Sequence, residues 1–339
     1  MRYGFRTQHN FPKRPGIFWG SIVLSLCLIG GGAFAQTPDV NLSPRPSKNA
    51  PKNPTPEAVT DRHANIRIDT TLVLIPASVT TMLGTFVAGL EKENFKVFED
   101  KVEQKIVTFS NQDAAMSIGI VFDTSGSMGD KLQRSRQAVA QFLKIANPED
   151  EFFLIEFNDR PELVLPFTHN PQEILNRLMT TKSHGSTALL DGVYLAMNHM
   201  RKAKNPRKAI LIISDGGDNA SRYTQTEVKN AVLEADTQIY GIGIFGGGMT
   251  PEEMAGPEML QRLASLTGGR SFNVVRLSEL TDVAEKIAIE LRNEYLVGFS
   301  PQNVARDGKW RRVEVKLMNL RGLPPLKVVF RTGYFAPVQ

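Results

Sequence analysis

Three stretches of the chain are continuously apolar, and each has the length of a β-strand. They are SIGIVF at 117–122, AILIISD at 209–215 (with its two polar residues last) and IYGIGIF at 239–245. Such runs are typical of parallel strands that are buried on both faces. Apolar residues recur at helical spacing between and after these runs, in stripes formed by Val139, Phe142, Leu143 and Ala146 and by Leu280, Val283, Ala284, Ile287 and Leu291. This alternation over residues 115–293 predicts an α/β domain with a mostly parallel sheet.

A fourth apolar stretch has a different pattern. Residues 152–168, FFLIEFNDRPELVLPFT, contain two extended apolar runs about a polar centre. This arrangement predicts a hairpin. We therefore expect the sheet to carry one antiparallel strand at an edge.

The segments on either side of the α/β region, residues 61–112 and 294–339, have the pattern of β-strands. In FKVFEDKVEQKIVTF, at 95–109, two short extended runs surround a polar EDK turn, which predicts a hairpin. Within WRRVEVKLM, at 310–318, residues 312–317 alternate strictly between charged and apolar positions. Because an isolated hairpin is only marginally stable in water, we expect the two flanks to pair into one small β-sandwich-like domain.

The N-terminus has the pattern of a secretory signal peptide. Four basic residues precede or border an apolar run at 17–29, which is followed by GGGAFA. We expect cleavage near Ala35 and a secreted or periplasmic protein. The apolar run is too short to span a bilayer comfortably, so no stable membrane span is expected after cleavage. Residues 36–60 contain six prolines and few apolar residues, and we expect a disordered linker there.

Charge and cysteine content exclude two classes of function. The formal net charge is +5, but residues 1–35 hold four basic and no acidic residues, which leaves 36 basic and 35 acidic residues beyond the signal peptide. That balance gives no general affinity for polyanions, and no nucleic-acid partner is expected. The only cysteine, Cys27, lies in the apolar run of the signal peptide. The secreted chain would therefore have neither a disulfide nor a thiolate metal site.

Polar residues gather where the predicted parallel strands end, which is where open α/β sheets bind ligands. DTSGSMGD, from residue 123, follows the first strand. HGSTALLDG, from residue 184, places Thr187 just before a predicted helix that begins near Leu189, and SDGGDN follows AILII. Carboxylate and hydroxyl oxygens predict a hard cation, most simply Mg²⁺, with Mn²⁺ or Ca²⁺ as alternatives. Two carboxylates and three hydroxyls would form the site, from Asp123, Ser125, Ser127, Thr187 and Asp215.

Such a metal site would also determine which chemical group of a partner it binds. Two carboxylates neutralise a divalent cation, and hydroxyls are weak neutral ligands, so the metal stays electrophilic. It would accept one more anionic oxygen, and the expected source is an Asp or Glu side chain of a protein partner.

The three motifs, in this order on this α/β pattern, resemble the metal-ion-dependent adhesion site of von Willebrand factor type A domains. The resemblance covers residues 115 to about 293, and it implies that all five residues named above bind the metal and that the domain serves in protein recognition or adhesion. With its β flanks, the chain also resembles a group of secreted bacterial proteins built on such a domain. One position departs from integrin members of the family: Lys131 stands where they have a second aspartate, which argues against a second metal.

Other interpretations remain for these residues. Asp, Ser and Thr at loop–helix junctions often act as helix N-caps, and Asp191 and Asp218 are expected to be caps or to support the ligands. His184 lies beside the threonine loop and is expected to be a surface residue. A metal-assisted hydrolase would need a general base near the site, and none stands out. A structural module with a vestigial site is the third class, alongside the non-enzymatic binding protein that we favour.

Overall fold

The computed structural model describes residues 72–338 except 216, 245–250, 319–321 and 323, and it leaves the side chains of 251–254 undescribed. The signal peptide predicted at 1–35, the linker predicted at 36–60 and the beginning of the first β flank lie outside the described residues. Within the described part, no helix is long and apolar enough to cross a membrane.

A six-stranded sheet forms the centre of the α/β region, in the order β10-β9-β8-β5-β6-β7. Its strands are β5 (Met116–Asp123), β6 (Glu151–Phe157), β7 (Pro161–Thr168), β8 (Arg207–Ser214), β9 (Gln238–Ile244) and β10 (Ser271–Val274). All neighbours are parallel except β6 and β7, which are antiparallel. The mostly parallel sheet and its antiparallel edge strand are thus as the apolar patterns predict.

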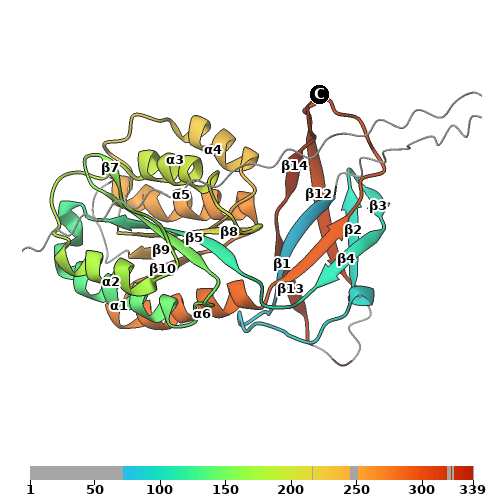
Figure 1. Cartoon of the computed structure of the whole chain (residues 1–339), viewed down its shortest axis with the longest axis horizontal. Helices are drawn as coiled ribbons and strands as arrows, with labels where there is room; N and C mark the ends of the chain where they lie inside the picture. Colours follow the sequence, from blue (N-terminus) through green and yellow to red (C-terminus); the bar gives the residue numbers. More distant parts are fainter. Residues whose placement is uncertain (1–71, 216, 245–250, 319–321, 323, 339) are drawn as a thin grey trace, which may run out of the picture. The chain divides into compact units, whose positions relative to one another are not determined.

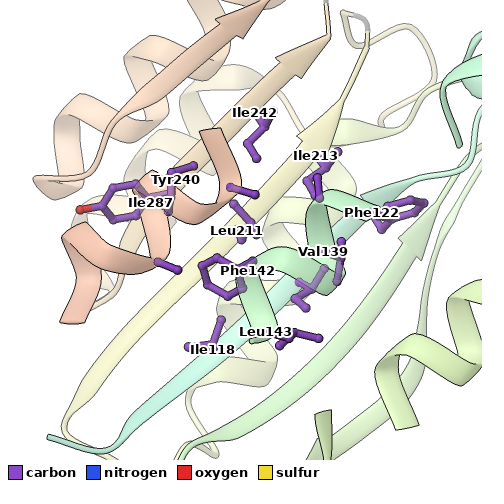
Figure 2. Packing of buried hydrophobic residues seen from close by; sticks show 14 of the residues in the cluster. Ile118, Phe122, Val139, Phe142, Leu143, Leu211, Ile213, Tyr240, Ile242 and Ile287 are labelled. Carbon is purple, nitrogen blue, oxygen red and sulfur yellow. The ribbon is translucent and has the colours of Figure 1, made fainter. Parts of the chain in front are cut away.

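Helices cover both faces of this sheet (Figure 1). One face carries α1 (Leu132–Leu143), α2 (Pro171–Thr180) and α6 (Leu280–Arg292), whose buried residues share one core cluster. The other face carries α3 (Leu189–Met200), α4 (Gln225–Glu234) and α5 (Pro251–Thr267), which contribute to a second cluster. Figure 2 shows the first cluster, where Phe142 of α1 and Ile287 of α6 pack beside Leu211 of β8. The two-sided burial explains why β5, β8 and β9 contain so few polar residues.

Strands from the two flanks form two further four-stranded sheets. One has the order β13-β1-β11-β4 and the other β14-β12-β2-β3, and every pairing in them is antiparallel. The strands are β1 (Val73–Thr81), β2 (Phe95–Glu99), β3 (Val102–Gln104), β4 (Ile106–Ser110), β11 (Tyr295–Phe299), β12 (Trp310–Leu317), β13 (Leu326–Phe330) and β14 (Gly333–Phe335). Apolar residues of both sheets share a third core cluster, so the flanks form a small β-sandwich-like unit with the α/β region inserted between them.

The predicted hairpin of the first flank is formed by β2 and β3, but the rest of its second run, Ile106–Ser110, is β4 and belongs to the other β sheet. The hairpin's turn residues Asp100 and Lys101 have φ of 46° and 73°. Positive φ at both central residues is the geometry whose twist matches that of two antiparallel strands. In β12 the buried residues alternate with exposed ones, as the sequence pattern predicts.

A buried carboxyl group lies where α6 leads into β11. Glu294 accepts hydrogen bonds from Gln238 Nε2 (2.7 Å) and the Tyr240 hydroxyl (3.2 Å), and it forms an ion pair with Arg207 (3.3 Å). Burial raises the pKa of Glu294 from 4.5 to about 7, although the Arg207 guanidinium acts in the opposite direction.

This raised pKa predicts a pH dependence of stability. Between about pH 4.5 and 7 the folded chain holds a proton on Glu294 that the unfolded chain has lost. The contribution of this group to the free energy of unfolding therefore falls as the pH rises through that window. We expect the Glu294→Gln variant to show a flatter melting temperature between pH 5 and 7 than the wild type, with both measured in chelator. If the melting temperatures of the two proteins depend on pH in the same way, Glu294 does not have a raised pKa.

Candidate metal site at the carboxyl edge of the sheet

Asp123 is the last residue of the central strand β5, and its side chain is buried. One carboxylate oxygen, Oδ1, accepts the backbone N–H of Ser125 at 2.8 Å. The other, Oδ2, accepts the hydroxyl of Ser214 at 2.5 Å. Burial raises the pKa of Asp123 to about 6, and the hydrogen bonds from these two serines lower it. A buried carboxylate of this kind gains most from a nearby cation.

The next side chains form a row of oxygens beside Asp123. Ser125 Oγ lies 3.1 Å from Ser127 Oγ, and Ser127 donates a hydrogen bond to Asp215 Oδ1 at 2.9 Å. Asp215 follows β8, the parallel neighbour of β5, so the common direction of the two strands brings both aspartates to one edge. The chain turns there through a short 3-10 helix, η2 (Gly126–Lys131), which leads into α1.

Thr187 reaches the same edge on the connection between α2 and α3. Gly126 N–H bonds to Gly185 O at 2.9 Å, and His184 N–H bonds to Thr124 O at 2.8 Å, which joins this connection to the serine loop. Gly185 has a φ of +76°, which favours glycine, and a Cβ there would lie 2.4 Å from the Asp159 carboxylate. Glycine at this position therefore lets the connection also pass close to the turn between β6 and β7.

The backbone of Thr187 is held from a second direction. Its N–H donates to Asn219 Oδ1 at 2.8 Å, and its carbonyl accepts the backbone N–H groups of Asn219 and Ala220. The Thr187 side chain is buried, and α3 begins two residues later, at Leu189 as predicted. The loops that carry the five predicted residues are thus brought together by β5, β8 and these backbone bonds.

Asp218 and Asp191 hold the loop after β8 against the start of α3. Asp218 accepts the backbone N–H of Leu190 at 3.2 Å, while Asp191 accepts those of Arg222 and Tyr223 at 2.8 and 3.0 Å. Burial raises the pKa of Asp218, and its bond from Ser221 lowers it. Both carboxylates are occupied by backbone groups, which fits the supporting role that the sequence suggests.

Two contacts of the site were not anticipated from the sequence. The first is the bond from Ser214 to Asp123 described above; a polar residue at the end of a buried run was its only signal. The second is an ion pair between Lys131 Nζ and Asp215 Oδ2 at 2.5 Å. In the sequence, Lys131 is only a departure from a family motif, and its separation of 84 residues from Asp215 does not indicate the pair.

A polar cleft of about 560 Å³ adjoins the site, between the β6–β7 turn and the α2–α3 connection. Thr124, in the serine loop, contributes to its lining. His184 is exposed at this cleft, and its Nε2 contacts Asn158 at 3.1 Å, as expected for a surface residue. The cleft is lined by charges of both signs, from Arg160, Arg177, Lys182, Glu156 and Glu162.

A metal site at this edge would draw on hydroxyl groups as well as on carboxylates. Among the described residues, no group of three or more His, Cys, Asp or Glu side chains is arranged to hold a metal ion. A cation here would depend on Ser and Thr oxygens in addition to Asp123 and Asp215. Oxygen atoms alone suit Mg²⁺, Mn²⁺ or Ca²⁺.

Comparison with known families agrees with this fold. Residues 118–217 match the model of the von Willebrand factor type A domain. That segment runs from β5 to just beyond Asp215 and includes all five predicted ligands. Residues 118–217 of the chain are thus similar to von Willebrand factor type A domains.

Relatives of known sequence match over part of their length. The chain is 30% identical over 148 residues to inter alpha-trypsin inhibitor, heavy chain 4, of Mus musculus, a match that covers 39% of this chain and 16% of that protein. It is 24% identical over 189 residues to an uncharacterized protein of Borreliella burgdorferi, covering 48% and 54%. The chain thus spans about half or less of these relatives.

Similar solved structures are more distant. A von Willebrand factor type A protein from Catenulispora acidiphila aligns over 80% of this chain and 75% of its own, with 11% identity and a TM-score of 0.47. Proximal thread matrix protein 1 from the mussel byssus, in a form with a zinc-occupied MIDAS motif, aligns over 57% and 50%, with 17% identity and a TM-score of 0.46.

Proposed function

We propose that this protein binds a divalent cation at the carboxyl edge of its sheet and uses it, without catalysis, to bind a protein partner. The observation that supports the proposal most is the row of Ser125, Ser127 and Asp215 oxygens beside buried Asp123. Ser125, Ser127 and Thr187 would be direct ligands, and Asp123 and Asp215 would act partly through water. The metal would supply an electrophilic position for an oxygen of the partner.

The spacing of the two serine hydroxyl oxygens is compatible with Mg²⁺. Octahedral ligands at about 2.1 Å from Mg²⁺ are about 3.0 Å apart along each edge. Ser125 Oγ and Ser127 Oγ are separated by 3.1 Å, which is also the distance of a hydrogen bond. These two proposed ligands could therefore bind Mg²⁺ without a large movement.

A carboxylate is the partner group that this chemistry favours. Two aspartates balance a divalent cation, and the neutral hydroxyls leave it able to bind a further anionic oxygen. The adjoining cleft offers space for residues on either side of that carboxylate, and its lining carries both cations and the carboxylates of Glu156 and Glu162. We therefore expect the partner to offer an Asp or Glu side chain to the metal, with residues of mixed charge on either side of it.

Capture from native extracts with and without chelator tests the proposal. Mg²⁺ binding by calorimetry, together with a partner that is retained in Mg²⁺ and released by EDTA, is expected. Metal binding with turnover of a bound ester or peptide would favour the hydrolase alternative. Absence of Mg²⁺, Mn²⁺ and Ca²⁺ binding would leave a structural module with a vestigial site.

Thr187→Val separates a metal ligand from a structural hydroxyl. Valine keeps the shape of the side chain and removes its oxygen. We expect a loss of Mg²⁺ affinity of about ten- to hundredfold, with little change of melting temperature in EDTA. Calorimetry and thermal unfolding would measure the two effects. A large loss of stability in EDTA with unchanged affinity would assign the hydroxyl to the fold instead.

A further inference from the structure

The Lys131 ammonium contacts the buried carboxylate of Asp215 in the candidate site. Its Nζ is 2.5 Å from Asp215 Oδ2, while Ser127 donates to Oδ1 of the same group. The Asp215 side chain has no exposed surface, and that of Lys131 is 22% exposed. A buried carboxylate is costly without a counter-charge, so this pair stabilises Asp215 where it is.

The backbone of Lys131 is fixed, but its side chain has room. Lys131 ends the η2 turn that also carries Ser127, and its carbonyl oxygen accepts the Ser135 hydroxyl at 3.0 Å. Leu132 N–H bonds back to Met128 O, and the Met128 side chain is buried. These backbone contacts fix the position of the Lys131 main chain beside the site. A flexible four-carbon stem lets its ammonium change position without any change of fold.

An ammonium and a divalent cation cannot share Asp215 without cost. Both are positive, and a cation held by Ser127 and Asp215 would stand within a few ångströms of Nζ in a buried setting where screening is weak. Like charges at such separations oppose each other strongly. The ammonium therefore has to leave Asp215, or the metal binds less tightly.

We infer that Lys131 is a built-in counter-cation of Asp215 that competes with the divalent metal. It holds the site in order without metal and sets the concentration of metal at which the site fills. This inference rests on the proposed function, since it concerns the same site. If the inference is right, removing the charge of Lys131 raises the affinity for the metal and lowers the stability of the metal-free protein.

The test compares Lys131→Gln with the wild type and with Lys144→Gln, a matched loss of charge at an exposed position just beyond α1. Calorimetric titration with MgCl₂ gives the dissociation constant, and thermal unfolding in EDTA gives the metal-free stability. For Lys131→Gln we expect a dissociation constant lower by about tenfold or more, a scale typical of groups around a metal site, and a lower melting temperature in EDTA. Lys144→Gln should match the wild type in Mg²⁺ affinity, and its melting temperature in EDTA should fall less than that of Lys131→Gln, because it loses only an exposed bond to Gln141 at the end of α1.

The outcomes separate this inference from the proposed function. If wild type and Lys131→Gln bind Mg²⁺ with equal affinity, or the variant binds more weakly, competition is refuted while the metal site stands. An unchanged melting temperature in EDTA would also refute it, because the ion pair would then contribute nothing. If no protein in the series binds Mg²⁺, Mn²⁺ or Ca²⁺, the proposed function fails and the inference with it. If Lys131→Gln binds Mg²⁺ and the wild type does not, the ammonium excludes the metal completely, which would support the inference.

Discussion

The Asp123→Ala variant is expected to lose at least about a hundredfold in Mg²⁺ affinity and to lose metal-dependent capture of its partner, while it keeps its fold. Asp123 provides one of the two negative charges that would balance the cation, and it orients the serine loop through the bond to Ser125 N–H. The metal therefore loses both charge compensation and a positioned loop. Calorimetry with MgCl₂, and capture with and without EDTA, measure the two effects.

The fold should tolerate this change because the carboxylate is costly where it lies. Burial raises the pKa of Asp123 to about 6, which shows that its ionised form is disfavoured in the folded chain. Removing it relieves that cost and offsets part of the loss of its bonds from Ser125 and Ser214. Asp123→Asn, which keeps the shape without the charge, should lose metal affinity in the same way.

Asp130→Ala is the matched control. Asp130 lies in the same η2 turn and is exposed, so its removal changes the net charge equally without touching the row of oxygens. Its Mg²⁺ affinity should stay close to that of the wild type. Equal affinities for Asp123→Ala and the wild type would show that the site has been assigned to the wrong residues.

Much of this architecture can be read from the sequence because two simple periodicities are physically enforced. Strands covered on both faces must be apolar throughout, as in β5, and strands with one wet face must alternate, as in β12. Parallel strands also end at the same edge, so Asp123 and Asp215 could be placed together although 92 positions separate them. That they bind metal remains a prediction.

The contacts that the sequence does not predict depend on turns and strand neighbours, and the spacing of apolar residues does not determine these. Lys131 contacts Asp215 because η2 turns the chain back over the end of β8. A short 3-10 turn has no periodic apolar stripe, so the sequence pattern does not predict it. In the same way, the pairing of β1 with both β11 and β13 joins segments more than 200 residues apart. Alternation shows that such strands have a buried face, but it does not choose their neighbours.

The second large effect is expected in the β-sandwich-like unit, where Arg311 of β12 meets Glu99 of β2. Their side chains form an ion pair at 3.0 Å, each only 3% exposed. Arg311 also donates to the carbonyl oxygens of Asn303 and Ala305, both at 2.7 Å. One flank of the chain supplies the carboxylate and the other supplies the guanidinium, so the pair exists only if the flanks fold together.

Arg311→Leu should therefore destabilise this unit by about 3–5 kcal/mol, the usual cost of leaving one member of a buried ion pair without its partner. Urea unfolding followed by Trp310 fluorescence measures it, because Trp310 is next to the mutated residue and packs on Phe335. The only other tryptophan, Trp19, is absent from a chain that begins after the predicted signal peptide. Arg312→Leu, on the exposed side of the same strand, should change stability by less than about 0.5 kcal/mol.

The double variant Glu99→Leu, Arg311→Leu tests why Arg311→Leu loses stability. If the loss arises from a carboxylate left buried without its counter-charge, removal of that carboxylate should recover most of the stability, since apolar replacements of a whole buried pair are often neutral or better. If the loss arises from the two carbonyl bonds of Arg311, the double variant should stay as unstable as the single one. A single variant as stable as Arg312→Leu would mean that the two flanks are not joined by this pair. Recovery in the double variant would instead establish a direct energetic link between residues 99 and 311 across the inserted α/β region.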